Sequence, residues 1–454
     1  MGKLFGTDGI RGLANEDPMT PEMAVKIGKA IAFYFKEKQK GEKNKKGIIV
    51  GRDTRISGPM LENALVSGIT SMGVDVYLTG VLPTPGIARM IVEENALAGV
   101  VISASHNPYF DNGIKIFNED GFKLSDKSET EIENHIMGKQ NRFLNKGINK
   151  TGRIYKVKNP VDNYVAFLKK SIPNGISFDG LKIIFDCANG ATFQAAPILF
   201  SELGIDSEFL FVEPDGMNIN DNCGSEHPDA LTKKVLEQGA DMGLAFDGDG
   251  DRLIAVDNKG TIATGDQIIA VFAHHLKNQN KLKENKAVTT IMSNMGLGVS
   301  LKELGITHGM SNVGDRYVME KMKTEGAVLG GENSGHIIFL DHHTTGDGML
   351  AGLKLLEAVC FSKKSLSELI NIMDIFPQKM INVEVKSKPE LESVPLIMEA
   401  IQTAEHSLGE KGRVLVRYSG TQPICRVMVE GPTEEETKNH CKMIAEAVGK
   451  HLAC

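Results

Sequence analysis

Tryptophan is absent from this sequence, and aromatic residues of all kinds make up only 6% of its 454 positions. Proteins that bind single-stranded nucleic acid stack the bases on aromatic side chains, so this composition disfavours such a surface. An excess of positive charge is also missing, because the formal net charge is −7 at pH 7. Nonspecific binding to nucleic acid or to an anionic membrane surface needs clustered Lys and Arg. We therefore expect no nucleic-acid partner and no membrane partner, although a local basic cluster could still bind a small anionic substrate.

Paired cysteines and long apolar segments are missing as well. The six cysteines are scattered along the chain without a Cys-x-x-Cys pair, which favours reduced thiols over a disulfide framework or a zinc site. No apolar run is long enough to cross a bilayer, and the first residues lack the apolar core of a signal peptide. These features predict a cytoplasmic protein.

A repeated pattern of strand, polar loop and helix organises most of the chain. A length of 454 residues exceeds what one hydrophobic core usually serves, so roughly three to four domains are expected. Apolar segments typical of buried strands begin the three copies, at Gly47–Gly51, Leu181–Phe185 and Ala287–Ile291. Because the helices of the second and third copies both end in Glu-Leu-Gly-Ile, we interpret the copies as related structural units.

The pattern changes from Ile381 onward to strand, helix, strand, loop, strand and helix, which indicates a small α+β domain. We therefore predict an α/β fold. In it, three related α/β domains with mixed or parallel sheets are followed by a small C-terminal α+β domain, and the polar loops of the three repeats can face one shared cleft. The expected domains are residues 1–157, 158–257, 258–374 and 375–454.

A serine after the strand that leads into the first polar loop is the candidate nucleophile. Ala98–Ile102 is typical of a buried strand in a parallel sheet, and ligands of such sheets bind beyond the carboxyl ends of the strands. Ser105 follows that strand, His106 is its neighbour, and Lys115 comes after a turn-rich segment. A hydroxyl, an imidazole and an amine in one place can supply a nucleophile with acid/base assistance. Because these residue types are also common in turns, a plain turn is the alternative at this point.

Three aspartates at alternating positions, Asp247, Asp249 and Asp251, give the strongest chemical signal in the chain. Neighbouring carboxylates repel one another unless a cation neutralises them, and an all-oxygen ligand set suits Mg²⁺ or Ca²⁺. The glycines between them allow the loop to curl around an ion. The spacing does not match an EF-hand, because Arg252 and Asn258 stand where that motif has Gly and Glu. We predict a divalent-cation site, with a solvated acidic turn as the alternative.

Other loops carry groups suited to a sugar or a phosphate. A glycine-rich segment offers donors and acceptors for sugar hydroxyls at Glu332, Ser334 and His336. Near the C-terminus, backbone amides, hydroxyls and guanidinium groups resemble a phosphate nest and lie at Arg417, Ser419, Gly420, Thr421 and Arg426. Two more arginines could reach an anion: Arg11 in a glycine-rich turn, and Arg316, which could instead pair with Asp315.

Five segments, in this order along the chain, resemble the motifs of the α-D-phosphohexomutase superfamily. They are Phe5–Gly12, Ile102–Pro108, Asp247–Arg252, Gly331–His336 and Arg417–Thr421. The resemblance spans essentially the whole chain and implies four domains around a central cleft. It also implies a phosphoserine at Ser105 and a Mg²⁺ ion held by Asp247, Asp249, Asp251 and an oxygen of that phosphoserine.

The same resemblance implies a role for each remaining candidate residue. His106 and Lys115 would assist proton transfer, while Arg11 and Arg252 would stabilise charge on the moving phosphoryl group. Glu332 and Ser334 would contact the sugar hydroxyls. The other substrate-binding candidates, most of them directed at the phosphate far from the serine, are His336, Arg316, Arg417, Ser419, Gly420, Thr421 and Arg426.

Within this superfamily the sequence is most similar to the bacterial branch that interconverts glucosamine 6-phosphate and glucosamine 1-phosphate. The resemblance implies a phosphorylated hexosamine as substrate and glucosamine 1,6-bisphosphate as intermediate and activator. The product would feed the synthesis of UDP-N-acetylglucosamine and cell-wall precursors. Asn333, Tyr418 and Gln422 stand where this branch usually has Gln, Pro and Glu, which leaves the sugar preference open. We expect a monomer or a homodimer.

Three other functions are compatible with parts of this pattern. A phosphomannomutase or phosphoglucomutase of the same superfamily would differ only in its preferred sugar. A phosphohydrolase with an aspartate nucleophile from the Asp247 loop would not need Ser105. A non-catalytic sensor of sugar phosphates is disfavoured, because binding alone gives little use for a metal site beside a serine.

Overall fold

The computed structural model describes residues 4–6, 8–38, 45–138, 151–419 and 423–453. The chain forms two compact units. The large unit comprises Met1–Ile291 and Ile306–Asn371, and the small unit comprises Met292–Gly305 and Ile372–Cys454.

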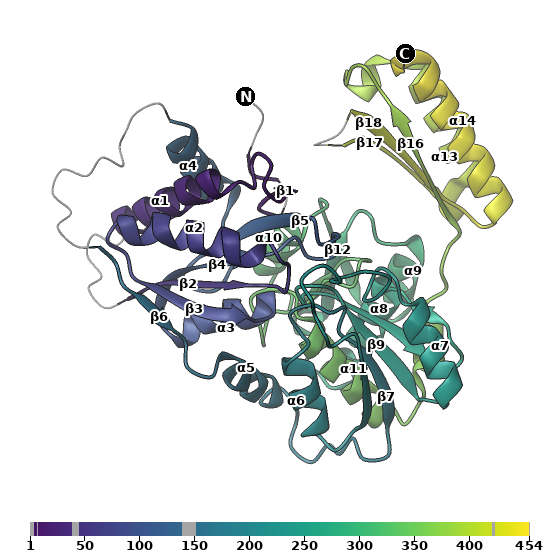
Figure 1. Ribbon diagram of the computed structural model, residues 1–454. Helices are drawn as coiled ribbons and strands as arrows, with labels where there is room; N and C mark the ends of the chain where they lie inside the picture. The colour runs from purple at the N-terminus through teal and green to yellow at the C-terminus, as the bar shows by residue number, and fades with distance from the viewer. Residues whose placement is uncertain (1–3, 7, 39–44, 139–150, 420–422, 454) are drawn as a thin grey trace. The chain divides into compact units, whose positions relative to one another are not determined.

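The first sheet of the large unit contains six strands in the order β1-β5-β4-β2-β3-β6. The strands are β1 Ile10–Leu13, β2 Lys46–Arg52, β3 Val76–Val81, β4 Ala96–Ile102, β5 Asp111–Phe117 and β6 Ile154–Lys156. β2 is parallel to both β3 and β4, whereas β4 is antiparallel to β5. Helices α1 Pro21–Lys38 and α2 Gly58–Ser71 lie on one face and α3 Thr84–Glu93 lies on the other (Figure 1). α4 Asp126–Met137 packs beside α1.

The first helix shows how the local sequence sets an element. Thr20 Oγ1 accepts a hydrogen bond from the Met23 N–H at 3.2 Å, and Pro21 occupies the first helical position, where its missing N–H costs nothing. Ile27 and Ile31 on its inner face are completely buried in the core shared with α2 and the sheet. Burying an aliphatic side chain of this size contributes roughly 1.5–3 kcal/mol, so packing against the sheet stabilises the helix more than its cap does.

Two further sheets of the large unit follow in the sequence. The second has the order β11-β10-β9-β7-β8, with β7 Lys182–Asp186, β8 Asp206–Leu210, β9 Met242–Phe246, β10 Leu253–Asp257 and β11 Ile262–Ala263. Its helices are α5 Pro160–Lys169, α6 Ala195–Ser201 and α7 Asp229–Gln238. The third has the order β13-β12-β14-β15, with β12 Lys286–Thr290, β13 Thr307–Ser311, β14 Leu329–Gly331 and β15 Ile337–Phe339. Its helices in the large unit are α8 Gly265–Asn278, α10 Asp315–Glu325, α11 Gly348–Ser362 and α12 Leu366–Leu369, with a short 3₁₀ turn at Lys283–Asn285.

All three sheets share one topology. The four-strand orders β5-β4-β2-β3, β10-β9-β7-β8 and β15-β14-β12-β13 correspond strand by strand, and each combines two parallel pairs with one antiparallel pair. The predicted α/β class and its threefold repeat are therefore confirmed. In every copy the polar loop connects the last parallel strand to its antiparallel neighbour. β11 pairs with β10, so the second sheet extends to Ala263, and the expected boundary at residue 257 stays a prediction.

The small unit contains the predicted α+β pattern. Three antiparallel strands lie in the order β16-β18-β17, with β16 Gln378–Glu384, β17 Arg413–Tyr418 and β18 Ile424–Glu430. Helices α13 Pro395–Leu408 and α14 Glu434–Leu452 contribute to its apolar core. α9 Met295–Glu303 also belongs to this unit. The buried Glu430 carboxylate holds the first residues of α9. Its oxygens accept hydrogen bonds from Asn294 Nδ2 and from the Met295 N–H, both at 3.2 Å.

The expectations about cysteine pairing and about membrane-spanning segments can be compared with the described part of the chain. The five cysteines that the structure describes are all free, and the expected absence of disulfides in the whole chain stays a prediction. Among the described helices, none combines the length and the apolar character that crossing a membrane would require.

Candidate active site

The three polar loops of the large unit meet one another. Ser105, after β4, donates a hydrogen bond from Oγ to Asp247 Oδ2 at 2.6 Å, although 142 positions separate the two residues in the sequence. The third loop pairs with the second through an isolated antiparallel β-bridge between the backbones of Arg252 and His336. The Leu253 N–H also donates a hydrogen bond to the Gly335 carbonyl at 3.0 Å. The large unit therefore joins a hydroxyl, an acidic loop and a glycine-rich loop in one site.

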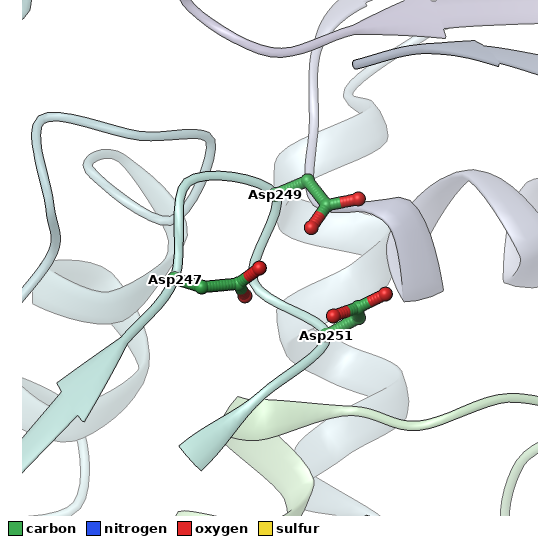
Figure 2. Close-up of side chains that lie close together, drawn as sticks. All are labelled: Asp247, Asp249 and Asp251. Atoms are coloured by element: carbon green, nitrogen blue, oxygen red, sulfur yellow. The ribbon is translucent and has the colours of Figure 1, made fainter. Parts of the chain in front are cut away.

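The acidic loop directs three carboxylates toward one another (Figure 2). Asp247, Asp249 and Asp251 are buried, and one carboxylate oxygen from each lies within 4.8 Å of the others. Gly250 has φ +73°, a conformation that glycine adopts without strain and that turns the loop between the second and third aspartate. Burial, with the charges of Asp249 and Asp251, raises the pKa of Asp247 well above its usual value. Such a set stays fully ionised only beside a cation.

The hydrogen bonds of the carboxylates show that a metal ion fits this loop. Lys115 Nζ and Thr84 Oγ1 donate to Asp249 Oδ2 at 2.8 and 2.6 Å, while Asp249 Oδ1 is buried without a hydrogen-bond partner among the described residues. Asp251 Oδ1 is also buried without a hydrogen bond within the described chain, although His336 Nδ1 lies 3.5 Å and Arg252 Nε 3.9 Å from it. Outer hydrogen bonds that fix a carboxylate and leave its other oxygen free are typical of metal sites. The triplet can therefore hold a divalent cation through oxygen ligands.

Ser105 occupies a strained and well-supported position. Its φ of +55° lies in the left-handed region, which non-glycine residues rarely adopt, and its relative exposure is 1%. His106 Nδ1 lies 3.3 Å from Ser105 Oγ. Burial, assisted by the charges of Arg252 and Arg11, lowers the pKa of His106 to about 4. The imidazole is therefore neutral at pH 7 and can exchange a proton with the hydroxyl beside it.

The pKa of Lys115 is shifted in the opposite direction from that of His106. Burial would lower its pKa, but Asp249, Asp8 and Asp251 outweigh burial and raise it. Its Nζ lies 2.8 Å from Asp249, 3.2 Å from Asp8 and 3.5 Å from Asp251. The three aspartates therefore favour the charged ammonium form of Lys115 in this structure, and its predicted part in proton transfer stays a prediction.

The ion pairs around Lys115 continue into a closed ring of alternating acidic and basic side chains. Asp8 also pairs with Lys123, and Lys123 pairs with Asp315. His336 completes the ring, with Nε2 3.5 Å from Asp315 and Nδ1 3.5 Å from Asp251. Burial lowers the pKa of His336, but the two aspartates outweigh burial and raise it. Asp8 and Lys123 are not among the site residues predicted from the sequence, although Asp8 lies within the glycine-rich segment that carries Arg11.

Two predicted arginines flank this ring. Arg11 pairs with Asp8 and donates from Nη1 to the Ala104 carbonyl at 3.2 Å, which places its guanidinium beside the serine loop. Arg252 donates from Nη1 to Glu226 at 3.2 Å, and its Nε lies 3.9 Å from Asp251. Both side chains are positioned to lower the energy of negative charge near Ser105.

The third loop supplies the candidate sugar contacts. Glu332 Oε1 accepts a hydrogen bond from the Gly314 N–H at 3.1 Å, and burial raises the pKa of Glu332. Ser334 Oγ is buried without a hydrogen-bond partner among the described residues. His336 lies in the ring described above, and the Gly346 N–H donates to its Nε2 at 3.2 Å.

Arg316 does not face the acidic loop. Its guanidinium donates to Glu129 from Nη1 at 2.9 Å and from Nη2, and also pairs with Asp126. The alternative pairing with Asp315 is wrong for the guanidinium, since only the Arg316 backbone N–H donates to Asp315, at 2.8 Å. Arg316 does line a cavity of about 440 Å³ that also borders Lys123 and His336. Its predicted contact with substrate stays a prediction.

The small unit carries part of the predicted phosphate loop. Arg417 and Arg426 are directly opposite each other on the antiparallel strands β17 and β18. Burial and the neighbouring Arg426 charge lower the pKa of Arg417, and within the described chain the Nε atoms of both arginines lack a hydrogen-bond partner. Like charges opposite each other destabilise a sheet, so the pair suits an anion that would neutralise both. The Ser419 N–H is used within the hairpin, where it donates to the Ile424 carbonyl at 2.9 Å, and Gly420 and Thr421 lie outside the described residues.

Comparison with known proteins gives matches along the whole chain. The four domain models described as phosphoglucomutase/phosphomannomutase match residues 2–143, 162–260, 264–376 and 380–447. The chain is 55% identical over 452 residues to a phosphoglucosamine mutase from Syntrophus aciditrophicus (strain SB), with 100% of both chains covered. It is 48% identical over 451 residues to a phosphoglucosamine mutase from Myxococcus xanthus (strain DK1622), with 99% of this chain and 98% of the relative covered. A solved phosphoglucomutase/phosphomannomutase family protein from Burkholderia thailandensis has a TM-score of 0.81 at 25% identity and covers 99% of this chain and 97% of its own.

Proposed function

The chain belongs to the phosphoglucomutase/phosphomannomutase family, and we propose that it interconverts glucosamine 6-phosphate and glucosamine 1-phosphate through a phosphoserine at Ser105. The observation that supports the mechanism best is the 2.6 Å hydrogen bond from Ser105 Oγ to Asp247 Oδ2, because it brings the Ser105 hydroxyl against a buried carboxylate triplet. The hexosamine substrate is supported by full-length relatives, 47–55% identical, that carry the name phosphoglucosamine mutase.

The proposed reaction has two phosphoryl transfers. In the first, the 1-hydroxyl oxygen of glucosamine 6-phosphate attacks the phosphorus on Ser105, the bond from phosphorus to Ser105 Oγ breaks, and the hydroxyl proton ends on Oγ. In the second, Ser105 Oγ attacks the 6-phosphoryl group of the reoriented glucosamine 1,6-bisphosphate, and the sugar oxygen O6 leaves with the Oγ proton. Glucosamine 1-phosphate is released, and Ser105 is phosphorylated again. Such transfers need chiefly positioning and charge stabilisation, which buried ionic groups supply.

The residues near Ser105 divide this work. His106, neutral at pH 7 and 3.3 Å from Oγ, is proposed to carry the proton, and the charged Lys115 to stabilise the transferring phosphoryl group with Arg11 and Arg252. Asp247, Asp249, Asp251 and an oxygen of the phosphorylated Ser105 would hold Mg²⁺, which would neutralise charge on the phosphoryl oxygens.

Substrate recognition is proposed for the remaining candidates. Glu332, Ser334 and His336 would bind the sugar, and Ser334 Oγ has no hydrogen-bond partner among the described residues to compete with a hydroxyl. The phosphate that is not being transferred would be bound by Arg316, Arg417, Ser419, Gly420, Thr421 and Arg426. The expected cytoplasmic location and the expected monomer or homodimer stay predictions.

A substrate panel with a Ser105→Ala control tests this function. Initial rates are measured for glucosamine, glucose and mannose phosphates with Mg²⁺ and a trace of sugar 1,6-bisphosphate. We expect the highest kcat/KM for glucosamine phosphate, a loss of at least about 10⁴-fold in Ser105→Ala, and a mass increase of about 80 Da on Ser105. A preference for mannose or glucose phosphate would instead identify a phosphomannomutase or phosphoglucomutase. Nearly intact turnover in Ser105→Ala would refute the phosphoserine mechanism and favour an aspartate nucleophile.

A further inference from the structure

Arg55 is a completely buried arginine in the loop between β2 and α2, next to the serine loop. An arginine has five N–H donors in a rigid planar fork, and burying any of them without an acceptor is costly. Its relative exposure is 0%, so water cannot satisfy these donors. The acceptors of Arg55 therefore indicate what this side chain does.

All five donors of the Arg55 guanidinium group have acceptors, and four of these are backbone carbonyls of one loop. Nε donates to Asp53 Oδ2 at 2.8 Å. Nη2 donates to the carbonyls of Ser105 and Asn107 at 2.9 and 2.7 Å. Nη1 donates to the carbonyls of Pro108 and Asp111, the latter at 3.1 Å. One side chain thus fixes the backbone of the serine loop from its first turn to the start of β5.

The backbone N–H of Ser105 is fixed through Ser103 by Asp53, the carboxylate that pairs with Arg55. The Ser105 N–H donates to Ser103 Oγ at 2.9 Å, and Ser103 Oγ donates to Asp53 Oδ2 at 2.6 Å. Asp53 is the carboxylate that holds Arg55 Nε. Asp53 and Arg55 therefore control both the N–H and the carbonyl of Ser105.

A second donor reaches the same carbonyls from the next sheet. Asn220, in the segment between β8 and α7, donates from Nδ2 to the Ser105 carbonyl at 2.9 Å and to the Asn107 carbonyl at 3.0 Å. Its φ of +59° lies in the left-handed region, which asparagine tolerates better than most residues. The Ser105 carbonyl is consequently held from two directions.

These contacts explain how Ser105 keeps an unfavourable backbone conformation. A non-glycine residue at φ +55° costs of order 1–3 kcal/mol and persists only where its surroundings impose it. The direction of Cβ, and with it the direction of Oγ toward Asp247, follows from that conformation. We propose that Arg55, assisted by Asn220, is a positioning residue that holds the Ser105 backbone so that Oγ faces the acidic loop. This inference rests on the proposed phosphoserine mechanism and adds to it a group that touches neither substrate nor metal.

The test measures phosphorylation of Ser105 directly. Dephosphorylated enzyme is mixed with glucose 1,6-bisphosphate and Mg²⁺, and the mass increase of about 80 Da is followed with time. Arg55→Lys keeps the positive charge but replaces the planar fork by a single ammonium group that cannot reach four carbonyls. We expect the phosphorylation rate and kcat to fall about 100-fold, with the KM for glucosamine 6-phosphate within about threefold of the wild type.

Matched variants separate positioning from loss of folded protein. Arg52→Lys alters a half-buried arginine of the same strand end, whose contacts are Glu62 and the Asp53 carbonyl, and it should stay within about twofold of the wild-type rate. Asn220→Gly keeps the left-handed conformation, removes the second donor, and should lower the rate about tenfold. Rates are expressed per folded enzyme, determined from the final phosphorylated fraction and the near-UV circular dichroism signal.

The outcomes distinguish this inference from the proposed function. A wild-type phosphorylation rate per folded enzyme in Arg55→Lys would overturn the positioning role, as would a loss confined to KM. If Arg55→Lys does not fold, a wild-type rate in Asn220→Gly would overturn it. A wild-type enzyme that is phosphorylated on Ser105 but turns over no glucosamine phosphate would refute the proposed substrate and leave the positioning role intact.

Discussion

Gly248, between the first two aspartates of the acidic loop, should not tolerate a methyl group. A Cβ at this position would lie 2.6 Å from the Ser105 carbonyl oxygen, 2.7 Å from Asn220 Nδ2 and 2.9 Å from Ile219 Cδ1. From the sequence, the glycines of this loop were interpreted as allowing it to curl around an ion. That interpretation fits Gly250, with φ +73°, whereas Gly248 is required because two backbones pack against each other.

The expected effect of Gly248→Ala follows from how little room the contact leaves. Ordinary contacts of a Cβ begin at 3.4 Å, so the loops must separate by about 0.8 Å. The Ser105 carbonyl cannot move away easily, because Arg55 and Asn220 both hold it. The acidic loop must shift instead, which lengthens the hydrogen bond between Ser105 and Asp247. A misplacement of about 1 Å can cost about 100-fold in rate, and overpacking costs about 1–3 kcal/mol.

Steady-state kinetics and thermal unfolding check this prediction together. We expect Gly248→Ala to lower kcat by about 10- to 100-fold and to lower the thermal midpoint. Gly352→Ala in α11 is the matched control, because its Cβ would meet Leu244 Cδ1 at 3.4 Å and Phe200 Cζ at 3.6 Å, both ordinary contacts. The control should keep the wild-type rate and be slightly more stable, since alanine favours helix over glycine by about 1 kcal/mol. A Gly248→Ala enzyme with wild-type kcat and thermal midpoint would refute the argument.

Three further predictions follow from the site and its support. Asp247→Asn removes one charge from the triplet and should raise the Mg²⁺ concentration for half-maximal activity at least about tenfold, measured by metal titration at saturating substrate; an unchanged titration would exclude Asp247 as a ligand. Arg417→Lys loses the planar fork and should raise KM for the hexosamine phosphate about tenfold with little change in kcat, and a loss confined to kcat would contradict a binding role. Burial raises the pKa of Asp347, the cap of α11, to about 7, so its protonated form stabilises the fold at low pH and this contribution is lost as pH rises from about 4 through 7. Asp347→Asn mimics the protonated form, so calorimetry between pH 5 and 8 should show a smaller loss of thermal stability than in the wild type; parallel pH profiles would disprove the assignment.

The repeated fold was predictable because its signals are local. Each copy contains an apolar strand, a polar loop and a helix, and α1, which precedes the first copy, has its own start signal in Thr20 before Pro21. The membership of α9 in the small unit was not predictable. It depends on Glu430, which contacts Asn294 at the start of α9 across 136 positions of sequence. A single glutamate in a strand carries no sign of such a distant partner.

The residues of the candidate site also differ in whether their signal is local in the sequence or depends on distant contacts. Asp247, Asp249 and Asp251 stand together in the sequence, and their repulsion is evident from spacing alone. Arg55 was not among the site residues predicted from the sequence, because its acceptors are backbone carbonyls of a segment about 50 residues away, which sequence composition does not reveal. Arg316 shows the opposite error, since a nearby Asp315 suggested a partner that the guanidinium does not use.

The shared topology of the three sheets accounts for why the site lies where it does. Each sheet ends its parallel strands at a loop that turns directly into an antiparallel neighbour, so the loop backbone is fixed on both sides by strand pairing. Rigid loops of this kind can meet with hydrogen-bond accuracy, as Ser105 does with Asp247 at 2.6 Å and Leu253 with Gly335 at 3.0 Å. None of these three described loops combines the proposed nucleophile, the proposed cation site and the proposed acceptors for sugar hydroxyls. The proposed phosphoryl transfer would therefore obtain its charge stabilisation where the three repeats meet, and a change that separates two loops by less than 1 Å should affect rate before it affects folding.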